Sequence, residues 1–267
     1  MTPSPEKPAE FVEALAKGIG ILESFDAAHP DMTLSEIARR VGLSPAAARR
    51  SLLTLESLGY IGRKDKRFFV RPKLMALAST FYDATGIDDI LHEDVQGVVE
   101  AFGDASSVGT LEGENVIYIA HCSVQRARRA AAAPGARYPA YATSMGRVLL
   151  AALPDDRLDT YIATCRLESL TSKTCTDRKA LRGDLMTVRA EGYATTVDQL
   201  DYGITALAVP IRDADGRTVA ALNTSGYTGL LTPEDLVRQR LPHLRQAASH
   251  ISHKLTRFPI LRSVLGG

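Results

Sequence analysis

The chain has 267 residues, of which 45% are hydrophobic and 24% are charged, and its formal net charge is +1. This composition is ordinary for a globular protein with a buried core, and it excludes a protein that binds nucleic acid through an overall basic surface. The charge is unevenly distributed, because residues 33–73 contain ten Lys or Arg but only three Asp or Glu. We therefore expect the N-terminal part to meet an anionic partner, the alternative being a solvated basic surface.

Cysteine use and apolar runs indicate where the protein works. The three cysteines, Cys122, Cys165 and Cys175, form no C-x-x-C motif, which favours reduced thiols over a disulfide framework or a zinc site. Residues 1–10, MTPSPEKPAE, lack the apolar segment of a signal peptide and are expected to be a disordered tail. No run approaches the roughly 20 apolar residues that span a bilayer. We expect a soluble cytoplasmic protein with no membrane contact, metal or cofactor.

Residues 11–71 have the pattern of a winged helix-turn-helix domain. The first segment has apolar residues spaced as one helical stripe, namely Phe11, Leu15, Ile19 and Leu22. Thr33 followed by Glu36 predicts the capping box of a second helix. Ser44 and Pro45 predict the N-cap and first position of a third helix that ends near Gly59. Two short helices joined by a tight turn form a helix-turn-helix.

The third helix is expected to enter the major groove of DNA. Its predicted core face consists of Ala48, Leu52, Leu55 and Leu58. Ala46, Arg49 and Arg50 lie broadly opposite this face, at about 100° per residue. Small side chains allow close approach to a surface, and arginines reach phosphates or guanine edges. The alternative for this arginine pair is a role in surface solubility alone.

A basic hairpin follows at once, in YIGRKDKRFFV, and predicts a wing that touches the DNA backbone. The predicted DNA contacts on the two helices and the wing are Thr33, Ser35, Ser44, Ala46, Ala47, Arg49, Arg50, Arg63, Lys64, Lys66 and Arg67. Residues 72–86 predict an amphipathic linker helix that ends near Gly86. Such linkers often pair with their own copies, so we expect a homodimer or homotetramer.

Residues 87–260 alternate between predicted helices and strands, which indicates an α+β domain with an antiparallel sheet. Turns are predicted at Gly113-Glu114 and at Asp215-Gly216. The final helix is expected to break or kink near Pro242.

Three features of this domain are candidates for a small-molecule site. Thr143 or Ser144 begins an apolar helix whose free N–H groups attract a carboxylate, with Gly146 keeping the approach open; ordinary capping is the alternative. Asp198 and Asp201 are loop acids, for which simple solvation is the alternative. The third feature is a polar end to an apolar strand, Asn223, Thr224 and Ser225, which turn-edge polarity explains equally well.

Enzyme signatures are missing from the sequence. It has no G-x-S-x-G elbow, phosphate loop or Rossmann fingerprint, and no spacing supports a triad around Ser144. His121-Cys122 suggests a thiol nucleophile less readily than a buried cysteine. The basic residues from Gln125 to Arg129, with Arg137, are interpreted as a solvated loop beside the pocket, not as a second nucleic-acid surface.

The sequence resembles the IclR family of bacterial transcriptional regulators over about residues 11–255. TLSEIARRVGLSPAAARRSLLTLESLGYI is similar to the family's DNA-binding motif, and RVLLAAL with GYATTVDQ and GITALAVPIRDADGRTVAALNTSG is similar to its effector domain. AAARRSLLTLESLGY and YPAYATSMGRVLLA most resemble the branch that controls protocatechuate, 4-hydroxybenzoate and β-ketoadipate catabolism.

The resemblance implies a GAF-like domain over residues 87–260 that binds a small effector, and dimers that often pair into tetramers. With Thr143 at the helix start, the implied effector contacts are Ser144, Met145, Asp198, Asn223 and Ser225. Ala206 replaces a cysteine that is common in the family, so a thiol contact is absent. The stretch VDQLDYG, which contains Asp201, is one residue shorter than the branch's usual form.

These observations predict a ligand-responsive transcription factor that binds operator DNA. The expected effector is an aromatic carboxylate such as 4-hydroxybenzoate or protocatechuate, or a dicarboxylic product of ring cleavage. Two alternatives are a ligand-independent structural DNA-binding protein and an enzyme of aromatic metabolism with a docking domain.

Overall fold

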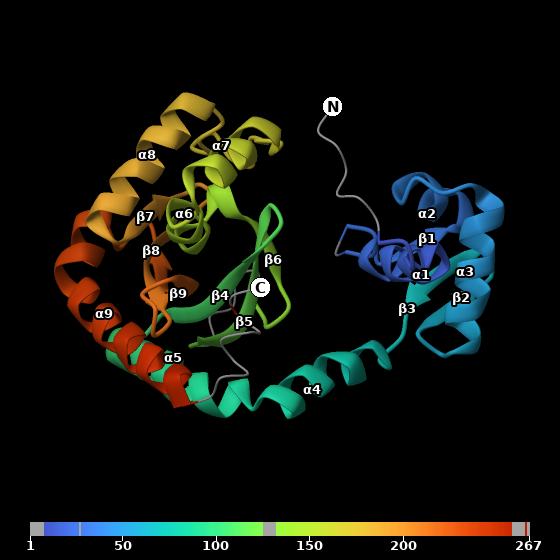
Figure 1. Cartoon of the computed structure of the whole chain (residues 1–267), viewed down its shortest axis with the longest axis horizontal. Helices are drawn as coiled ribbons and strands as arrows, with labels where there is room; N and C mark the ends of the chain where they lie inside the picture. Colours follow the sequence, from blue (N-terminus) through green and yellow to red (C-terminus); the bar gives the residue numbers. More distant parts are fainter. Residues whose placement is uncertain (1–7, 27, 125–131, 258–264, 266–267) are drawn as a thin grey trace. The chain divides into compact units, whose positions relative to one another are not determined.

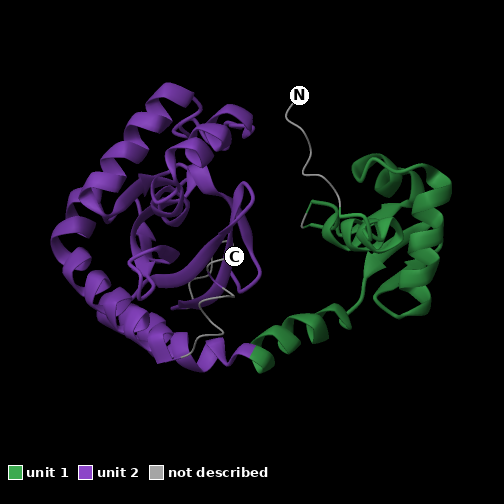
Figure 2. Cartoon of the chain, in the orientation of Figure 1, with its two compact units in different colours: residues 1–84 green, residues 85–267 purple. Residues whose placement is uncertain are grey.

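The computed structural model describes residues 8–26, 28–124, 132–257 and 265, and it divides into two compact units between Ala84 and Thr85 (Figure 2). The first unit contains α1 (Glu13–Glu23), β1 (Asp31–Thr33), α2 (Leu34–Arg40), α3 (Pro45–Ser57), β2 (Ile61–Lys64), β3 (Arg67–Val70) and most of α4 (Leu74–Thr85) (Figure 1). Its strands form an antiparallel sheet in the order β1-β3-β2. The predicted winged helix-turn-helix and linker helix are therefore confirmed.

The first unit differs from expectation at α1 and β1. Leu15 and Ile19 lie exposed on α1 and Phe11 lies exposed just ahead of it, whereas Ile21 is fully buried, so the helix turns a different face to the core than its apolar stripe predicts. The core of this unit comprises Ile21, Met32, Ile37, Leu52, Leu55, Ile61 and Phe68. Strand β1 was not predicted, since three residues carry too little pattern and the strand exists through its pairing with β3.

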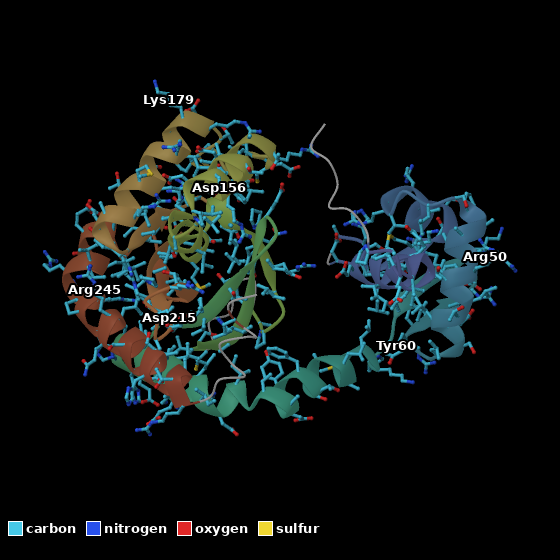
Figure 3. The ribbon with its side chains drawn as sticks, viewed as in Figure 1. Arg50, Tyr60, Asp156, Lys179, Asp215 and Arg245 are labelled. Atoms are coloured by element: carbon cyan, nitrogen blue, oxygen red, sulfur yellow. The ribbon has the colours of Figure 1, made fainter. Side chains whose placement is uncertain are left out.

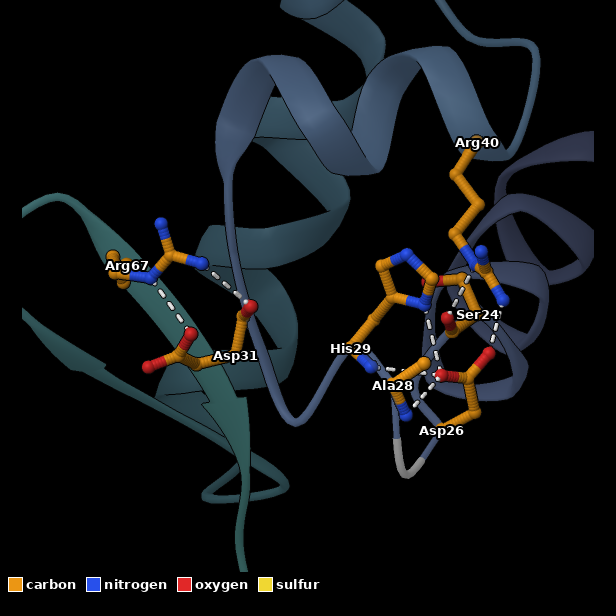
Figure 4. Close-up of polar contacts among 7 residues, drawn as sticks. All are labelled: Ser24, Asp26, Ala28, His29, Asp31, Arg40 and Arg67. Atoms are coloured by element: carbon orange, nitrogen blue, oxygen red, sulfur yellow. Dashed lines mark hydrogen bonds and ion pairs between the residues drawn. The ribbon is translucent and has the colours of Figure 1, made fainter.

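A polar turn fixes the connection between α1 and α2 (Figure 4). The Asp26 carboxylate accepts hydrogen bonds from the backbone N–H groups of Ala28 and His29 at 2.9 and 2.8 Å. Arg40, at the end of α2, forms an ion pair with Asp26 and donates from Nε to the carbonyl of Ser24 at 2.8 Å. Arg40 thus ties the end of α1 and the turn that follows it to α2, the helix that precedes the recognition helix.

The second unit begins with α5 (Ile87–Phe102), β4 (Ala105–Glu112), β5 (Asn115–Ser123), β6 (Arg137–Pro139) and the short 3-10 helix η1 (Ala140–Ala142). It continues with α6 (Ser144–Ala151), α7 (Asp155–Thr164), α8 (Arg178–Glu191), β7 (Ala194–Val197), β8 (Ile204–Arg212), β9 (Thr218–Tyr227) and α9 (Pro233–Arg257). The antiparallel sheet has the order β6-β5-β4-β9-β8-β7. Helices α5 and α9 pack together on one face, and α6 packs on the other with α8 beside it (Figure 1).

The structure confirms both predicted hairpins, since β4 pairs with β5 across Gly113-Glu114 and β8 pairs with β9 across Asp215-Gly216. Helix α9 continues as one helix from Pro233 to Arg257 with Pro242 inside it, so the expected break is absent and the alternative of a kink stays a prediction. Between α6 and the sheet lies a core that includes Ala208 and Ala221.

Helix α6 lies in very close contact with the preceding chain at Gly146. A Cβ atom built on Gly146 would lie 2.1 Å from the carbonyl oxygen of Ala140, a backbone atom that cannot move aside alone. This glycine is therefore required by the packing of η1 against α6, and not by the open approach to a ligand that the sequence suggested.

Replacing Gly146 by Ala is expected to destabilise the second unit. Forcing extra atoms into a packed core costs about 1–3 kcal/mol, and here the opposing atom is backbone. Circular dichroism melting of the full-length chain measures this change. Gly183→Ala is the matched control, because Gly183 lies in α8 with nothing within 4 Å of an added Cβ. Because alanine has a higher helix propensity than glycine, Gly183→Ala should raise the free energy of unfolding by about 0.5–1 kcal/mol. Equal behaviour of the two variants would contradict the packing argument.

Candidate functional site

The helix-turn-helix is held by the caps that its sequence predicted. Thr33 and Glu36 form a reciprocal capping box at the start of α2. The Ser44 hydroxyl accepts the backbone N–H of Ala47 at 3.3 Å, and Pro45 takes the first helical position of α3. The hydroxyls of Thr33 and Ser44 are thus engaged in capping, whereas Ser35 is exposed.

Helix α3 presents opposite faces to the core and to solvent, as predicted for a recognition helix. Ala48, Leu52 and Leu55 are buried, whereas Ala46, Arg49 and Arg50 are exposed and Ala47 is half-buried. Figure 3 shows Arg50 projecting outward from this helix. Leu58, expected on the core face, is exposed because the helix ends at Ser57 and Leu58 serves as its C-cap.

The four basic wing residues have different surroundings. Lys64 and Lys66 are exposed at the tip of the β2–β3 hairpin. Arg63 Nε lies 3.4 Å from a carboxylate oxygen of Glu56 on α3. Arg67 donates to the Asp31 carboxylate at 2.7 Å and to its carbonyl at 2.8 Å, and so fastens β3 to β1 (Figure 4). The guanidinium predicted to grip DNA at Arg67 is therefore already engaged within the protein.

Glu36 makes the stability of the fold depend on pH. Hydrogen bonds from the backbone N–H and the hydroxyl of Thr33 hold the pKa of Glu36 below its ordinary value. Because the folded-state pKa is lowered, the carboxylate stabilises the fold above the unfolded pKa of about 4.3. This contribution is lost as the pH falls through the folded pKa.

Glu36→Ala should therefore lower the melting temperature at pH 7, and the difference from the parent should shrink as the pH falls below about 4. Melting of the full-length chain followed by circular dichroism at pH 7 and pH 3.5 gives both differences. Glu10→Ala, at an exposed position ahead of α1, is the control and should have little effect at either pH. A difference for Glu36→Ala that is the same at both pH values would show that the charge plays no part.

The second unit contains a cavity of about 680 Å³ on the α6 side of its sheet. Its floor consists of two rows of side chains that run across the strands and follow from the register. The first row runs from β5 to β7 through Ser123, Ala105, Ser225, Ala206 and Thr196. The second row consists of His121, Ser107 and Asn223. It continues into Ala208 and Ala194, which belong to the core.

Two buried polar atoms at this cavity have no hydrogen-bond partner in the described part of the chain. They are the Ser144 hydroxyl oxygen, at the first residue of α6, and Asn223 Oδ1, on β9. Both residues line the cavity, and both are more than nine-tenths buried. A buried polar atom without a partner costs about 1–3 kcal/mol, so this pair is suited to meet polar groups of a ligand.

The predicted effector contacts divide into two groups. Thr143, Ser144, Asn223 and Ser225 line the cavity together, and the Thr143 hydroxyl caps α6 by accepting the N–H of Gly146 at 3.0 Å. Met145 does not line it, because its side chain is fully buried in the core beneath α6.

Asp198 is also absent from the cavity wall, and Asp201 lines it instead. With a φ of 51°, Asp198 turns its carboxylate back onto its own loop and accepts the N–H of Gly203 at 2.7 Å and the hydroxyl of Thr228 at 2.8 Å. Its carboxylate therefore shapes the β7–β8 loop, and neither Asp198 nor Met145 is among the residues that line the cavity.

Sequence reasoning missed several cavity residues. Ser107 Oγ and His121 Nδ1 lie 2.9 Å apart on paired strands, and burial lowers the pKa of His121. Tyr118 and Tyr138 meet edge to face with ring centroids 5.0 Å apart, and burial raises the pKa of both phenols. His121 and Ser123 lie two residues apart on β5, and this alternation is a signal that could have found His121; Ser106 and Ser107 are adjacent on β4 and give no such signal.

Charges around the cavity are partly neutralised within the protein. Asp104 forms a buried ion pair with Arg240 of α9, with 2.8 Å between Nη2 and Oδ2. Arg137 pairs with Glu112 at the sheet edge. Residues 125–129, predicted as a basic loop beside the pocket, lie outside the described residues. Within the described ranges, no cluster of three or more His, Cys, Asp or Glu is arranged to hold a metal ion.

Comparison with known proteins agrees with this architecture. The family model for the IclR helix-turn-helix domain matches residues 14–65, and the model for the C-terminal part of bacterial IclR transcriptional regulators matches residues 80–253. The chain belongs to the IclR family. This IclR-family protein is a bacterial transcriptional regulator with a helix-turn-helix DNA-binding domain. No helix in the described ranges has the length and apolar character to cross a membrane.

Individual relatives of this IclR-family regulator cover nearly the whole chain. The Pca regulon regulatory protein of Pseudomonas putida is 33% identical over 92% of this chain and 85% of that protein. The p-hydroxybenzoate hydroxylase transcriptional activator of Acinetobacter baylyi is 29% identical over 91% of each. A crystal structure of an IclR homologue from Microbacterium hydrocarbonoxydans, complexed with 4-hydroxybenzoate, has a TM-score of 0.73 and 25% identity, covering 91% of this chain and 99% of that one.

Proposed function

We propose that this IclR regulator binds operator DNA through α3 and the wing, and controls genes of aromatic-acid catabolism in response to an aromatic carboxylate. The observation that carries the ligand-binding part is a pair of buried atoms at one cavity, Ser144 Oγ and Asn223 Oδ1, which have no hydrogen-bond partner among the residues that the structure describes. The names of two relatives, which refer to the Pca regulon and to p-hydroxybenzoate hydroxylase, support the class of genes.

The charge of the first unit supports the DNA-binding surface. Arg49 and Arg50 are exposed on α3, and Lys64 and Lys66 are exposed at the wing. A helix that enters the major groove reads base edges, whereas basic residues at a hairpin tip neutralise phosphates. We assign the base-reading role to Arg50 and the phosphate-neutralising role to Lys66. Arg67 contributes indirectly, by holding the wing sheet together.

Arg50→Ala should weaken operator binding by about 1–3 kcal/mol and relax sequence preference, because an arginine that reads a base discriminates by this amount. Lys66→Ala should weaken binding to all duplexes alike and lower the slope of log K against log salt by about one. Fluorescence anisotropy, on a duplex that the parent protein selects from a random pool, measures both. If the two variants bind this duplex as the parent does, the proposed docking is wrong.

The chemistry of the cavity supports an effector with a carboxylate and a hydroxyl group. A carboxylate at the start of α6 would accept from the Ser144 hydroxyl and from backbone N–H groups, and the helix dipole favours a negative charge there. Asn223 Oδ1 is an acceptor and needs a donor, which a phenolic hydroxyl supplies. Tyr118 and Tyr138 add aromatic surface at the same cavity. A hydroxybenzoate carries both groups on one ring.

Thermal unfolding against a panel of acids tests this proposal on the full-length chain. The panel contains 4-hydroxybenzoate, protocatechuate and dicarboxylic ring-cleavage products, each beside its carboxamide. A true effector at 100 times its Kd adds about 2.7 kcal/mol, which raises the melting temperature by about 5–10 °C at this size. The chain has no tryptophan, so circular dichroism is the readout.

Ser144→Ala should reduce this shift, whereas Ser249→Ala on the exposed surface of α9 should not. A panel in which no aromatic acid moves the melting temperature would refute the aromatic-acid part of the proposal. It would leave the DNA-binding part standing.

Two alternatives make different predictions. A ligand-independent DNA-binding protein would show no change in operator affinity with any acid. An enzyme with a docking domain would turn over its ligand and lose that activity in Ser144→Ala. We favour the regulator because the family comprises transcriptional regulators, and we place its action in the cytoplasm, where bacterial DNA lies.

We also propose that the chain works as a homodimer or homotetramer. Helix α1 exposes Leu15 and Ile19, with Phe11 exposed just ahead of it, and α4 exposes Met75 and Leu77. None of the residues of α4 is buried in the described chain. Exposed apolar surface of this extent is typical of an interface.

A further inference from the structure

The cavity wall contributed by the β7–β8 loop carries one amide whose orientation is fixed. The side-chain oxygen Oε1 of Gln199 accepts a hydrogen bond from Arg147 Nη2 at 3.0 Å and another from the backbone N–H of Cys175 at 2.8 Å. The reversed amide would bring its NH2 group against two donors, so only one orientation is compatible with these neighbours. The NH2 group of Gln199 therefore points away from both.

Gln199 lines the cavity, and its Nε2 has no hydrogen-bond partner among the described residues. Its backbone is held as firmly as its side chain. Thr174 donates to the Gln199 carbonyl at 2.7 Å, Thr171 donates to the Asp198 carbonyl at 2.5 Å, and the Tyr202 hydroxyl accepts the N–H of Ser172 at 2.9 Å. The loop between α7 and α8 thus fixes Gln199 before any ligand arrives.

Arg147 supplies the charge behind this amide. It follows Ser144 by three residues on α6, so both lie on one side of the helix about one turn apart. Its side chain is 7% exposed, and it donates from Nε to the carbonyl of Tyr141 at 3.0 Å. Its nearest carboxylate, on Asp184, is 3.6 Å away and half-exposed, and so compensates the buried cation incompletely.

We propose that Gln199 Nε2 donates a hydrogen bond to the effector's carboxylate, and that Arg147 is the positioning residue that orients this amide without touching the effector. The inference rests on the proposed binding of a carboxylate at the α6 terminus. Ser144 then provides one donor to the carboxylate, and Gln199, on the β7–β8 loop, provides the second. The NH2 group of Gln199 selects for a hydrogen-bond acceptor on the effector, and the positive charge of Arg147 strengthens the preference for a negatively charged acceptor.

Gln199→Glu tests the donor role with nearly unchanged shape. Glutamate keeps an oxygen for Arg147 and Cys175 but replaces the NH2 group by a second oxygen. The affinity for 4-hydroxybenzoate should fall about 10- to 100-fold, the usual value of a hydrogen bond to a charged group. The affinity for 4-hydroxybenzamide should hold or rise, because its own NH2 group can donate to the new carboxylate. Calorimetric titration of the full-length chain measures this acid-to-amide ratio.

The matched control is Gln246→Glu, which makes the same change of charge on the exposed surface of α9 and should leave the ratio unchanged. If Gln199 had a purely structural role, Gln199→Glu would lower the affinity for both ligands equally. The acid-to-amide ratio therefore distinguishes a structural role from the donor role. If 4-hydroxybenzoate binds parent and Gln199→Glu alike, the inference is overturned while the proposed function stands.

The same titrations separate the remaining outcomes. If only non-aromatic dicarboxylic acids bind the parent, and Gln199→Glu loses them, the aromatic effector is refuted and the role of Gln199 is supported. If no carboxylate of the panel binds, both claims fall.

The positioning role of Arg147 requires a double-mutant cycle. Arg147→Lys keeps the charge but offers a different hydrogen-bonding geometry, and it should lower the affinity for the acid in the parent background. In a Gln199→Met background the same change should have little further effect, because Arg147 acts through the amide. Additive losses would show that Arg147 acts independently of Gln199. Circular dichroism of each variant confirms that the fold is retained.

Discussion

The position of α6 on the sheet decides which sheet residues are core and which line the cavity. Gly146 lets α6 lie directly against the backbone of η1, and Thr143 caps the start of the helix. The cross-strand row of His121, Ser107 and Asn223 faces the cavity, whereas its continuation at Ala208 and Ala194 is core beneath the helix. The first turn of α6 is consequently both the edge of the core and the wall of the site.

Single contacts between distant residues also hold the first unit together. Its wing is held by Arg67 on Asp31, and the turn before α2 is held by Arg40 on Asp26. Basic residues that fasten the fold are thereby separated from basic residues at the tip and on α3, which remain exposed. Exposed cations contribute little to stability, so their concentration on one helix and one hairpin is better explained by a phosphate-bearing partner.

Local sequence patterns predicted the structural features that depend on one short segment of the chain. The capping box at Thr33, the N-cap at Ser44 and the polar positions Asn223 and Ser225 follow from neighbours within a few residues, and the structure has each feature where the sequence indicates it. Residues were misjudged where distant segments decide their surroundings. Arg67 meets Asp31, 36 positions earlier, only because β1 pairs with β3.

In the second unit, the surroundings of loop residues could not be predicted from the sequence. Asp198 was expected at the ligand because of its place after a strand, but its positive φ directs the carboxylate back into its own loop. Gln199, its neighbour, lines the cavity through contacts with Cys175 and Arg147, which lie 24 and 52 residues away in the chain. No sequence period connects such positions, so only the folded chain shows them together.

The two carboxylates that line the cavity, those of Asp104 and Asp201, are compatible with the proposed acidic effector. Asp104 is neutralised by Arg240, which also donates to Thr224 on the opposite face of β9 from Asn223. Asp201 is exposed, so water screens it.

The buried Arg147 and the N-terminus of α6, which is equivalent to about half a positive charge, add positive charge near Ser144. Under the proposed function this charge would favour an anion at that point, and Asn223 Oδ1 would accept a hydrogen bond from a donor of the ligand. A hydrocarbon ligand would leave both Ser144 and Asn223 unpaired at a cost of about 1–3 kcal/mol each. The proposed hydroxy acid would pair both.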